Sequence, residues 1–344
     1  MFGRFADALS REIELRADEI SDNVNTLYFG GGTPSVLPLC VFERLLSSLR
    51  RTGHGDPYEE FTVEVNPEDV VSRGQSYVEG LLKLGVNRIS MGVQSFDDGI
   101  LKFMNRRHDS VTARKAYAIL ESAGVPNVSI DLIFGLPQLS DSQWQDTLDK
   151  ALGISPSGRL PQHISSYQLS VEPGSMLAKL VERGRWGEAS EELCERQYGM
   201  LCETLRKAGY SHYEISNFAL PGYEARHNSA YWRHVPYVGF GPGSHSFDGT
   251  SRKWNEPDLR KYLEDPTGCQ DGEKLTREQL VLERIMLALR TADGISESYL
   301  QEHCSPDELA RALASDNLVP LPDGNVRIPE DRFFVSDRII SDLI

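Results

Sequence analysis

The feature that most constrains the fold is a regular alternation of short apolar runs and longer amphipathic stretches between residues 26 and 169. The runs are rich in β-branched and aromatic residues and are bounded by Gly, Pro or Asn, which is typical of strands. The stretches between them carry apolar residues at helical spacing, which predicts a βαβ arrangement with right-handed crossovers. The sequence therefore predicts an α/β fold with a parallel sheet or barrel. The five predicted strands are 26–29, 61–65, 88–93, 128–134 and 163–169.

The chain opens inside a predicted helix, because Phe5, Leu9 and Leu15 follow a helical spacing with no strand before them. In a strand-then-helix alternation such a helix lacks its partner strand. Either the helix is an addition to the fold, or a strand lies upstream of Met1. Without that strand, segment 26–29 or its neighbour would be an exposed parallel edge, which natural proteins normally cover.

The pattern changes after residue 170. Residues 188–208 predict one long amphipathic helix, and residues 210–254 hold ten aromatic residues and four of the eight histidines. The Pro/Gly/Asp-rich stretch 264–274 is typical of a linker. Beyond it, Thr276 and Gln279 predict a capping box, residues 325–328 a hairpin arm and 333–344 a helix. We therefore expect a barrel with an extension over about 170–263 in residues 1–263, a linker, and a small α+β domain at 275–344.

Charge and hydropathy exclude several partners. The chain has 36 Lys and Arg against 51 Asp and Glu, a net charge of −15. This balance disfavours nucleic acids and anionic membrane surfaces, which attract clustered basic residues. No apolar run approaches the roughly 18 residues of a membrane span, and the acidic N-terminal segment is unlike a signal peptide. We expect a soluble cytoplasmic protein with no nucleic-acid partner and no membrane span.

The five cysteines are scattered, and no two of them are spaced as C-x-x-C or C-x-x-x-C. This distribution disfavours a disulfide framework and a zinc or iron-sulfur site built from local sequence. The sequence predicts buried, unreactive thiols. The positions are Cys40, Cys194, Cys202, Cys269 and Cys304.

In parallel α/β folds the loops after the carboxyl ends of the strands build the site. The first predicted strand is followed by glycines 30–32 and Thr33, whose backbone N–H groups could approach a ligand closely. A tight turn is the alternative. Glu64, Gln94 and Asp131 at three other strand ends would suit a ligand with hydroxyls and an amine, such as a ribose and an amino-acid head group. For each of them alone, a cap or a strand-end hydrogen bond is the alternative.

Two further segments carry candidate binding chemistry. Arg106 has the guanidinium needed to pair a carboxylate bidentately, although a solvated surface arginine is the alternative. His227 lies beside Tyr231 and Trp232, so that a neutral imidazole is flanked by aromatic rings. This is the chemistry of an axial haem ligand with stacking surfaces for a porphyrin. A structural histidine is the alternative.

Several ordered motifs together resemble a known family. They are LYFGGGTPS at 27–35, EVNP at 64–67, NRISMGVQSF at 87–96 and DLIFGLP at 131–137. Over residues 5–344 the chain resembles radical S-adenosylmethionine proteins of the oxygen-independent coproporphyrinogen III oxidase family. Within that family the motif His227-Asn228-x-x-Tyr231-Trp232 resembles the HemW-like haem chaperone branch rather than the oxidase.

The resemblance implies a partial six-stranded (β/α) barrel, here without its first strand, followed by a small C-terminal domain from about residue 275. It implies that Gly32 and Thr33 contact the methionine end of S-adenosylmethionine. The other residues that it assigns to this pocket are Glu64, Gln94, Arg106, Asp131 and Gln168. It assigns a haem-binding motif to His227, Asn228, Tyr231 and Trp232.

The chain departs from the family in one respect. The family carries a C-x-x-x-C-x-x-C motif after its first strand, and three thiolates there hold a 4Fe-4S cluster; none of the five cysteines matches it. Together with the unpaired first helix, this predicts that about 30 to 40 residues, one strand and its cluster loop, lie upstream of Met1.

Three functions remain open at this point. The leading hypothesis is a HemW-like haem chaperone that passes haem to an acceptor protein, with the cluster and S-adenosylmethionine bound only in a full-length form. The second is an oxygen-independent coproporphyrinogen III oxidase, which decarboxylates propionates with a 5′-deoxyadenosyl radical. The third is a shortened chain without activity, and a homodimer is left open throughout.

Overall fold

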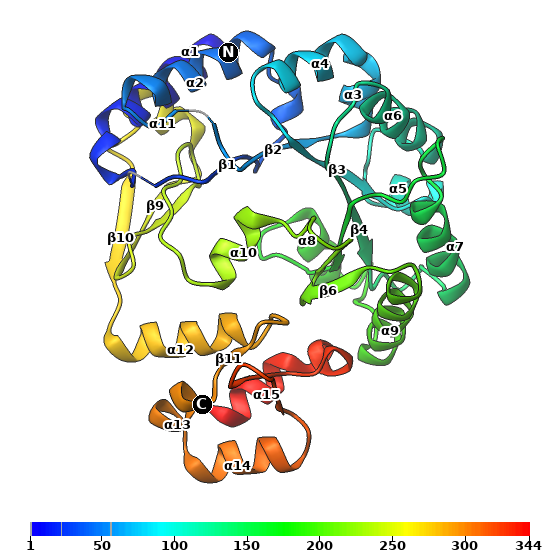
Figure 1. Cartoon of the computed structure of the whole chain (residues 1–344). Helices are drawn as coiled ribbons and strands as arrows, with labels where there is room; N and C mark the ends of the chain where they lie inside the picture. Colours follow the sequence, from blue (N-terminus) through cyan, green and yellow to red (C-terminus); the bar gives the residue numbers. More distant parts are fainter. Residues whose placement is uncertain (1, 22, 56) are drawn as a thin grey trace.

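The structure is a computed structural model and describes residues 2–21, 23–55 and 57–344. Its main sheet has seven strands in the order β1-β2-β3-β4-β5-β7-β6 and curls into a half-barrel (Figure 1). Strands β1 to β5 are parallel, whereas β7 is antiparallel to β5 and β6 is antiparallel to β7. The α/β barrel prediction is thus confirmed. The strands are Thr26–Phe29 (β1), Glu60–Val65 (β2), Arg88–Gln94 (β3), Val128–Phe134 (β4), His163–Gln168 (β5), Ser211–Glu214 (β6) and Asn217–Ala219 (β7).

Helices cover the outer, convex face of the sheet (Figure 1). The apolar residues of the strands, such as Phe61, Val63, Ile89 and Ile130, point to these helices and are fully buried. The helices of this layer are Leu39–Arg51 (α2), Pro67–Arg73 (α3), Gln75–Lys83 (α4), Asp98–Phe103 (α5), Ser110–Ser122 (α6), Asp141–Leu152 (α7) and Glu191–Lys207 (α9). The 3-10 turn Ala17–Glu19 (η1) precedes β1, the turn Pro34–Val36 (η2) lies between β1 and α2, and helix Met176–Glu182 (α8) lies between β5 and α9.

The concave face of the sheet is polar. Side chains alternate between the two faces of a strand, so the residues between the apolar ones point into the barrel. Parallel strands buried on both faces are usually apolar throughout, and this alternation therefore marks the inner face as a place for polar ligands or polar networks. The inward set is Thr26, Tyr28, Glu60, Thr62, Glu64, Arg88, Ser90, Ser129, Asp131, His163 and Ser165.

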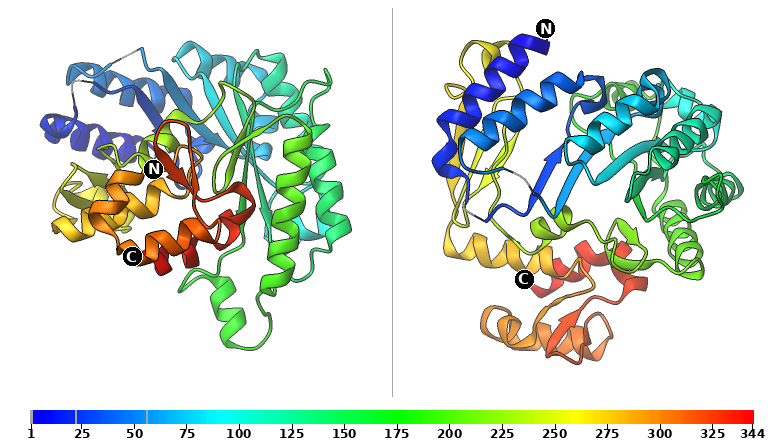
Figure 2. Two further views of the ribbon diagram at one scale, coloured as in Figure 1. Left: turned by 60° about the horizontal axis from the view of Figure 1, so that its bottom comes forward. Right: turned by 45° about the horizontal axis from the view of Figure 1, so that its top comes forward.

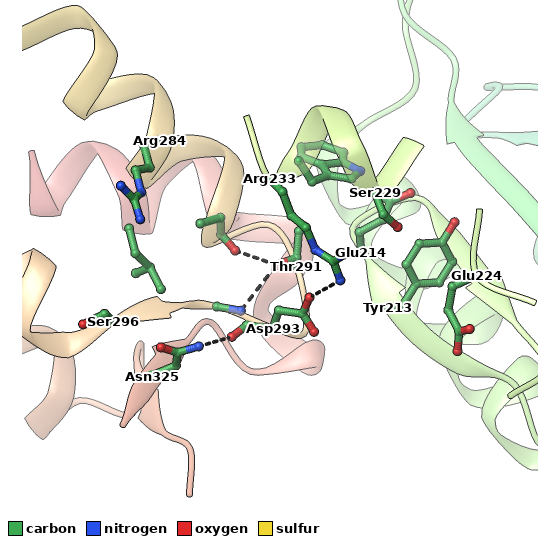
Figure 3. A pocket seen from close by; sticks show the side chains of 14 residues that line it. Tyr213, Glu214, Glu224, Ser229, Arg233, Arg284, Thr291, Asp293, Ser296 and Asn325 are labelled. Carbon is green, nitrogen blue, oxygen red and sulfur yellow. Dashed lines mark hydrogen bonds and ion pairs between the residues drawn. The ribbon is translucent and has the colours of Figure 1, made fainter. Parts of the chain in front are cut away.

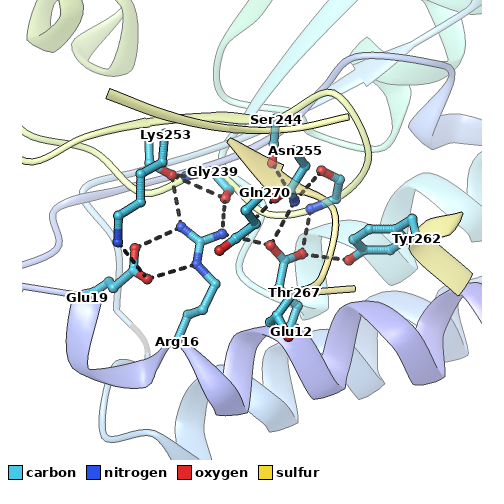
Figure 4. Close-up of polar contacts among 12 residues, drawn as sticks. Glu12, Arg16, Glu19, Gly239, Ser244, Lys253, Asn255, Tyr262, Thr267 and Gln270 are labelled. Atoms are coloured by element: carbon cyan, nitrogen blue, oxygen red, sulfur yellow. Dashed lines mark hydrogen bonds and ion pairs between the residues drawn. The ribbon is translucent and has the colours of Figure 1, made fainter. Parts of the chain in front are cut away.

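The N-terminal helix Phe2–Leu15 (α1) is tied to residues far along the chain. Its fully buried Glu12 forms an ion pair with Arg16 at 2.7 Å. The Glu12 carboxylate also accepts hydrogen bonds from the Tyr262 hydroxyl at 2.6 Å, the Asn255 amide at 2.8 Å and the Gly241 N–H at 2.8 Å (Figure 4). Helix α1 is thus an integral part of the described fold.

Of these partners of α1, Asn255 belongs to a second, three-stranded antiparallel sheet, Tyr262 to helix Leu259–Glu264 (α11), and Gly241 to the loop before that sheet. The strands are His245–Phe247 (β8), Ser251–Asn255 (β9) and Gln270–Lys274 (β10), in the order β10-β9-β8. Five residues of the predicted 264–274 linker therefore form a strand, and that part of the linker prediction is wrong. The polar composition of residues 270–274 is suited to an exposed edge strand, which composition alone does not distinguish from a linker.

The C-terminal part begins with helix Arg277–Ala288 (α12), whose predicted capping box between Thr276 and Gln279 is confirmed. Strand Asn325–Arg327 (β13) lies between Ile295–Ser296 (β11) and Val319–Pro320 (β12). Helices Glu297–His303 (α13) and Pro306–Ala314 (α14) follow β11, and the predicted last helix starts as the 3-10 turn Glu330–Val335 (η3) before Ser336–Leu343 (α15). Figure 2 shows this part, coloured orange to red, gathered at one side of the molecule.

Among the described residues, no helix combines the length and the hydropathy that a membrane crossing requires.

Candidate functional site

The loop after β1 is joined to the end of β2 through Glu64. The Tyr28 hydroxyl donates a hydrogen bond to Glu64 Oε1 at 2.7 Å, and the Gly31 N–H donates to Glu64 Oε2 at 3.1 Å. Burial raises the pKa of Glu64, while these two hydrogen bonds lower it. A Cβ atom on Gly30 would lie 2.2 Å from Tyr28 Cε1 and 2.8 Å from Glu64 Oε1, so the close approach requires glycine there. The glycine loop thus contacts a carboxylate of the protein itself.

Arg106 and Gln94 lie together at the end of β3. The Arg106 guanidinium donates from Nη2 to Asn66 Oδ1 at 2.9 Å and to the Gly92 carbonyl at 3.3 Å. A Cβ atom on Gly92 would meet Gln94 Nε2 at 2.8 Å and Arg106 Nη2 at 3.2 Å. Gln94 has a φ of 67° at a break in the β3–β4 register, a backbone conformation that residues other than glycine rarely adopt. Such backbone strain is frequent at ligand sites.

Asp131 on β4 lies next to Ser90 of β3 in the barrel mouth. It accepts hydrogen bonds from the Ser90 hydroxyl at 3.0 and 3.2 Å. Burial raises its pKa to about 6; Ser90 and the Arg88 charge lower it, and the Glu64 carboxylate raises it further. Arg88 is itself buried, and among the described residues its Nε has no hydrogen-bond partner. Two carboxylates and a buried cation thus share one small volume.

The other predicted pocket residues lie at the rim of this mouth. Gln168 is exposed at the end of β5, with its Cγ 3.0 Å from the Cβ position of Gly135. Gly32 is exposed, and a Cβ atom there would have no neighbour within 4 Å. Thr33 precedes η2, and its carbonyl accepts the Val36 N–H at 3.1 Å. The mouth therefore combines an acidic interior with a polar, open rim, and the role of each residue toward a ligand stays a prediction.

The predicted haem motif lies on helix Arg226–Trp232 (α10), on the concave side of the main sheet (Figure 1). The backbone N–H groups of Arg226 and His227 donate to the two Glu60 carboxylate oxygens at 2.8 and 3.1 Å. A carboxylate is favourable at the positive end of a helix. Helix α10 also contacts β1, the edge strand of the sheet. The edge predicted from the sequence is thus flanked by the helix that carries His227.

His227 is held by three side chains. Its Nδ1 lies 2.8 Å from Thr26 Oγ1, and its Nε2 lies 3.0 Å from the Tyr231 hydroxyl. Its ring stacks on Tyr28, with ring centres 4.9 Å apart and an interplanar angle of 19°. Burial lowers the pKa of His227, the Glu60 carboxylate raises it, and the Arg88 charge lowers it again. Tyr28 therefore touches both candidate sites, His227 through its ring and Glu64 through its hydroxyl.

The rest of the motif does not share this environment. Asn228 is half-buried on α10, and Trp232 lines a cavity of about 360 Å³ between α10, β6 and the C-terminal part (Figure 3). Glu214 in this cavity wall is fully buried. Burial raises its pKa to about 7, against hydrogen bonds from Ser216, Asn217 and Trp232 that lower it. Tyr231 and Trp232 thus face different surroundings, His227 in one case and the cavity in the other.

The sequence motifs did not single out five residues of these networks, because only the polar residues near the carboxyl ends of the strands were predicted to face a ligand. The signal that could have found four of them is the polar residue at every second position of each parallel strand. Glu214 is the last residue of the short antiparallel strand β6 and has no comparable signal. The five are Thr26, Tyr28, Glu60, Arg88 and Glu214.

The cysteines do not gather. Cys194 and Cys269 are buried, Cys202 and Cys304 are partly buried, and Cys40 is exposed on α2, so the prediction of a buried thiol is wrong for Cys40. Cys40 lies on the face of the amphipathic helix α2 that points to solvent. In the described parts of the chain, no three or more His, Cys, Asp or Glu side chains are arranged to hold a metal ion. These residues therefore do not fit a 4Fe-4S cluster.

Comparisons with known proteins identify the family. The model of the radical SAM superfamily matches residues 3–151. The heme chaperone HemW of Synechocystis sp. is 34% identical, over 91% of this chain and 75% of its own length. HemW of Lactococcus lactis is 34% identical over 86% of this chain and 76% of its own. A mitochondrial radical S-adenosyl methionine domain-containing protein 1 of Danio rerio is 30% identical over 95% and 75%.

The fold is also similar to a solved structure. Coproporphyrinogen III oxidase HemN from Escherichia coli superimposes with a TM-score of 0.77, covering 99% of this chain and 82% of that one at 22% identity. The curled sheet with its outer helices is thus the HemN architecture. On the sequence identity over most of both chains, this protein belongs to the HemN/HemW family of radical S-adenosylmethionine proteins.

Proposed function

We propose that the protein is a haem chaperone that binds haem through His227 and passes it to an acceptor protein. Two of the relatives above carry the name heme chaperone HemW. The observation that carries the proposal is the set of hydrogen bonds made by His227. Its Nδ1 is held by Thr26, and among the described residues the hydrogen-bond partner of its Nε2 is the hydroxyl of Tyr231, a 39% exposed tyrosine. A neutral imidazole with an approachable nitrogen is an axial haem ligand.

The surroundings of His227 suit a cargo rather than a permanently enclosed cofactor. Tyr28 and Tyr231 offer ring surfaces on two sides of the imidazole, with Tyr231 at a ring-centre distance of 5.0 Å. Aromatic rings favour contact with a flat apolar macrocycle. Because Tyr231 is exposed, haem bound at Nε2 would stay at the protein surface. An acceptor protein could then reach it without unfolding of the chaperone.

We further propose that the barrel mouth holds S-adenosylmethionine. The carboxylates of Glu64 and Asp131 suit its amine and ribose hydroxyls, while the Arg106 guanidinium and the Gln94 amide suit its carboxylate. In the family, S-adenosylmethionine beside a reduced cluster supplies a 5′-deoxyadenosyl radical. Cluster binding would need cysteines outside this sequence. No observation on the described residues favours the oxidase reaction over the chaperone.

Haem titration tests the proposal. Hemin is added to the wild-type protein, to His227→Ala and to His245→Ala, in which an exposed histidine on β8 is removed as a control. We expect His227→Ala to lose the shift of the Soret band and to bind hemin at least about tenfold more weakly. His245→Ala should behave like the wild type. Equal Soret shifts in all three proteins would contradict the role of His227.

A further inference from the structure

The hydrogen bonds of His227 restrict which of its nitrogens carries the proton. A neutral imidazole has one N–H donor and one acceptor nitrogen. Thr26 Oγ1 at 2.8 Å from Nδ1 and the Tyr231 hydroxyl at 3.0 Å from Nε2 can each donate or accept. Two arrangements of the protons therefore satisfy both hydrogen bonds. In one, Nδ1–H donates to Thr26 and the Tyr231 O–H donates to Nε2; in the other, both directions are reversed.

Hydroxyl chemistry favours the first arrangement. A phenol, with an ordinary pKa near 10, is a much stronger acid than an alcohol and hence the better donor. An aliphatic hydroxyl oxygen is in turn the better acceptor. With Tyr231 as donor and Thr26 as acceptor, the proton of His227 is on Nδ1 and the free electron pair is on Nε2. That pair is the one that points toward the exposed side of α10.

The two partners differ in how firmly they are held. Thr26 lies on β1, where the main chain is paired with β2 in register with Glu60. Tyr231 is 39% exposed near the end of α10, and the described ring neighbours of its side chain are His227 and Tyr237. Rotation of a tyrosine side chain about two torsions is enough to remove its hydroxyl from Nε2. Thr26 can therefore act as a fixed support and Tyr231 as a movable cover.

We infer, on the basis of the proposed haem-binding function, that Thr26 is a positioning residue that presents the Nε2 electron pair of His227. Tyr231 is then a removable cap whose hydroxyl competes with haem iron for this electron pair. The Tyr28 ring, stacked at 4.9 Å, sets the plane of the imidazole. Partners that orient a metal-binding histidine through its other nitrogen commonly influence metal affinity about 10- to 100-fold. This role explains why the Tyr231 hydroxyl is bonded to Nε2, the nitrogen that haem iron would bind.

Three variants test the inference with hemin as the probe. We expect Thr26→Val, which keeps the shape of the side chain, to weaken hemin binding about 10-fold or more, and Thr26→Ser to restore it. We expect Tyr231→Phe to tighten hemin binding about threefold to tenfold, the effect of one lost competing hydrogen bond. The histidine-ligated signature in resonance Raman spectra should be unchanged in Tyr231→Phe. Tyr223→Phe, an exposed tyrosine before α10, is the control and should bind as the wild type does.

A haem-free measurement keeps this inference separate from the proposed function. The ¹⁵N chemical shifts of His227 in the free protein report its tautomer directly, and we expect the proton on Nδ1 in the wild type and a mixture in Thr26→Val. A proton on Nε2, unchanged binding in Thr26→Val, or weaker binding in Tyr231→Phe would overturn the inference. If His227→Ala still binds hemin with the wild-type signature, the proposed function fails instead. If His227→Ala loses hemin while Thr26→Val keeps it, only the positioning role fails.

Discussion

Gly30 and Gly32 lie two positions apart in the same loop, yet only Gly30 is crowded. A Cβ atom on Gly30 would meet Tyr28 and Glu64, whereas one on Gly32 would have no neighbour within 4 Å. The Tyr28 ring cannot yield easily, because it is stacked on His227 and hydrogen-bonded to Glu64. At the scale of single residues, the site thus depends on a few close approaches that the glycine-rich motif permits.

We predict that Gly30→Ala lowers the free energy of unfolding by about 1 to 3 kcal/mol, because the added methyl group displaces the Tyr28 ring. Gly32→Ala, the matched control, should stay within about 0.5 kcal/mol of the wild type. Urea unfolding followed by circular dichroism measures both values. Equal stabilities of the two variants would show that the Tyr28 ring is not constrained as described.

Glu214 predicts a dependence of stability on pH. Its pKa is raised by burial from the ordinary 4.5 to about 7, so the folded state binds a proton more tightly than the unfolded state. The contribution of this group to the free energy of unfolding is therefore largest at low pH and falls as the pH rises from about 4.5 to about 7. The total change is about 3 kcal/mol.

Glu214→Gln should remove this slope, so that the variant gains stability relative to the wild type as the pH rises through that window. Glu224→Gln changes a partly exposed carboxylate in the same cavity wall and is the control. Thermal unfolding of the three proteins at several pH values gives the comparison. A constant difference between Glu214→Gln and the wild type at all pH values would refute the prediction.

At the scale of elements, helix α1 is held by one buried carboxylate rather than by apolar contacts alone. Glu12 accepts three hydrogen bonds from residues more than 200 positions away and pairs with Arg16. Breaking one partner of a buried pair leaves the other charge without compensation. The neighbouring Glu14 is exposed and pairs with the exposed Arg51, an interaction that contributes little.

We predict that Glu12→Ala lowers the free energy of unfolding by about 3 to 5 kcal/mol, while Glu14→Ala changes it by less than about 1 kcal/mol. Hydrogen exchange should also speed up in residues 239–255, which include the Glu12 partners Gly241 and Asn255. Chemical denaturation and hydrogen-exchange mass spectrometry check the two parts. Unchanged exchange in that segment would mean that α1 does not hold the second sheet in place.

At the scale of the whole molecule, the C-terminal part is attached to the barrel through β6 and α9. The Ile215 N–H donates to the Arg290 carbonyl at 3.0 Å, and the Ala292 N–H donates to the Tyr213 carbonyl at 2.9 Å. Phe333 is fully buried, with its ring centre 5.0 Å from that of His212. The Phe333 side chain thus helps to anchor the C-terminal part to β6.

We predict that Phe333→Ala costs about 3 to 5 kcal/mol, because it opens a cavity at this contact. The loss should be local first, so that limited proteolysis cuts the C-terminal part faster and calorimetry shows a broader or divided transition. Val335→Ala removes an exposed side chain from the same turn and should have little effect. Indistinguishable proteolysis of the two variants would show that Phe333 is not the anchor.

Local patterns were sufficient for many of the elements. The five strands of the parallel sheet, the capping box of α12 and the helix of residues 191–207 all follow from spacing and from end signals within a few residues. Strand β10 and the β6–β7 pair did not follow, because short polar strands acquire their stability from a partner strand that local sequence does not specify.

Family membership and the polar ends of the strands were likewise determined by the sequence itself, because ordered motifs and side-chain types are written along the chain. Tertiary structure alone decided which residues meet: Thr26 with His227, Tyr28 with Glu64, and Glu12 with Tyr262. Hydrogen bonds and ring contacts act over a few ångströms. The partners in these pairs are 36 to 250 residues apart in the chain, and the sequence between them does not predict which side chains come within that distance. The pairing of His227 with an edge strand is therefore a property of packing.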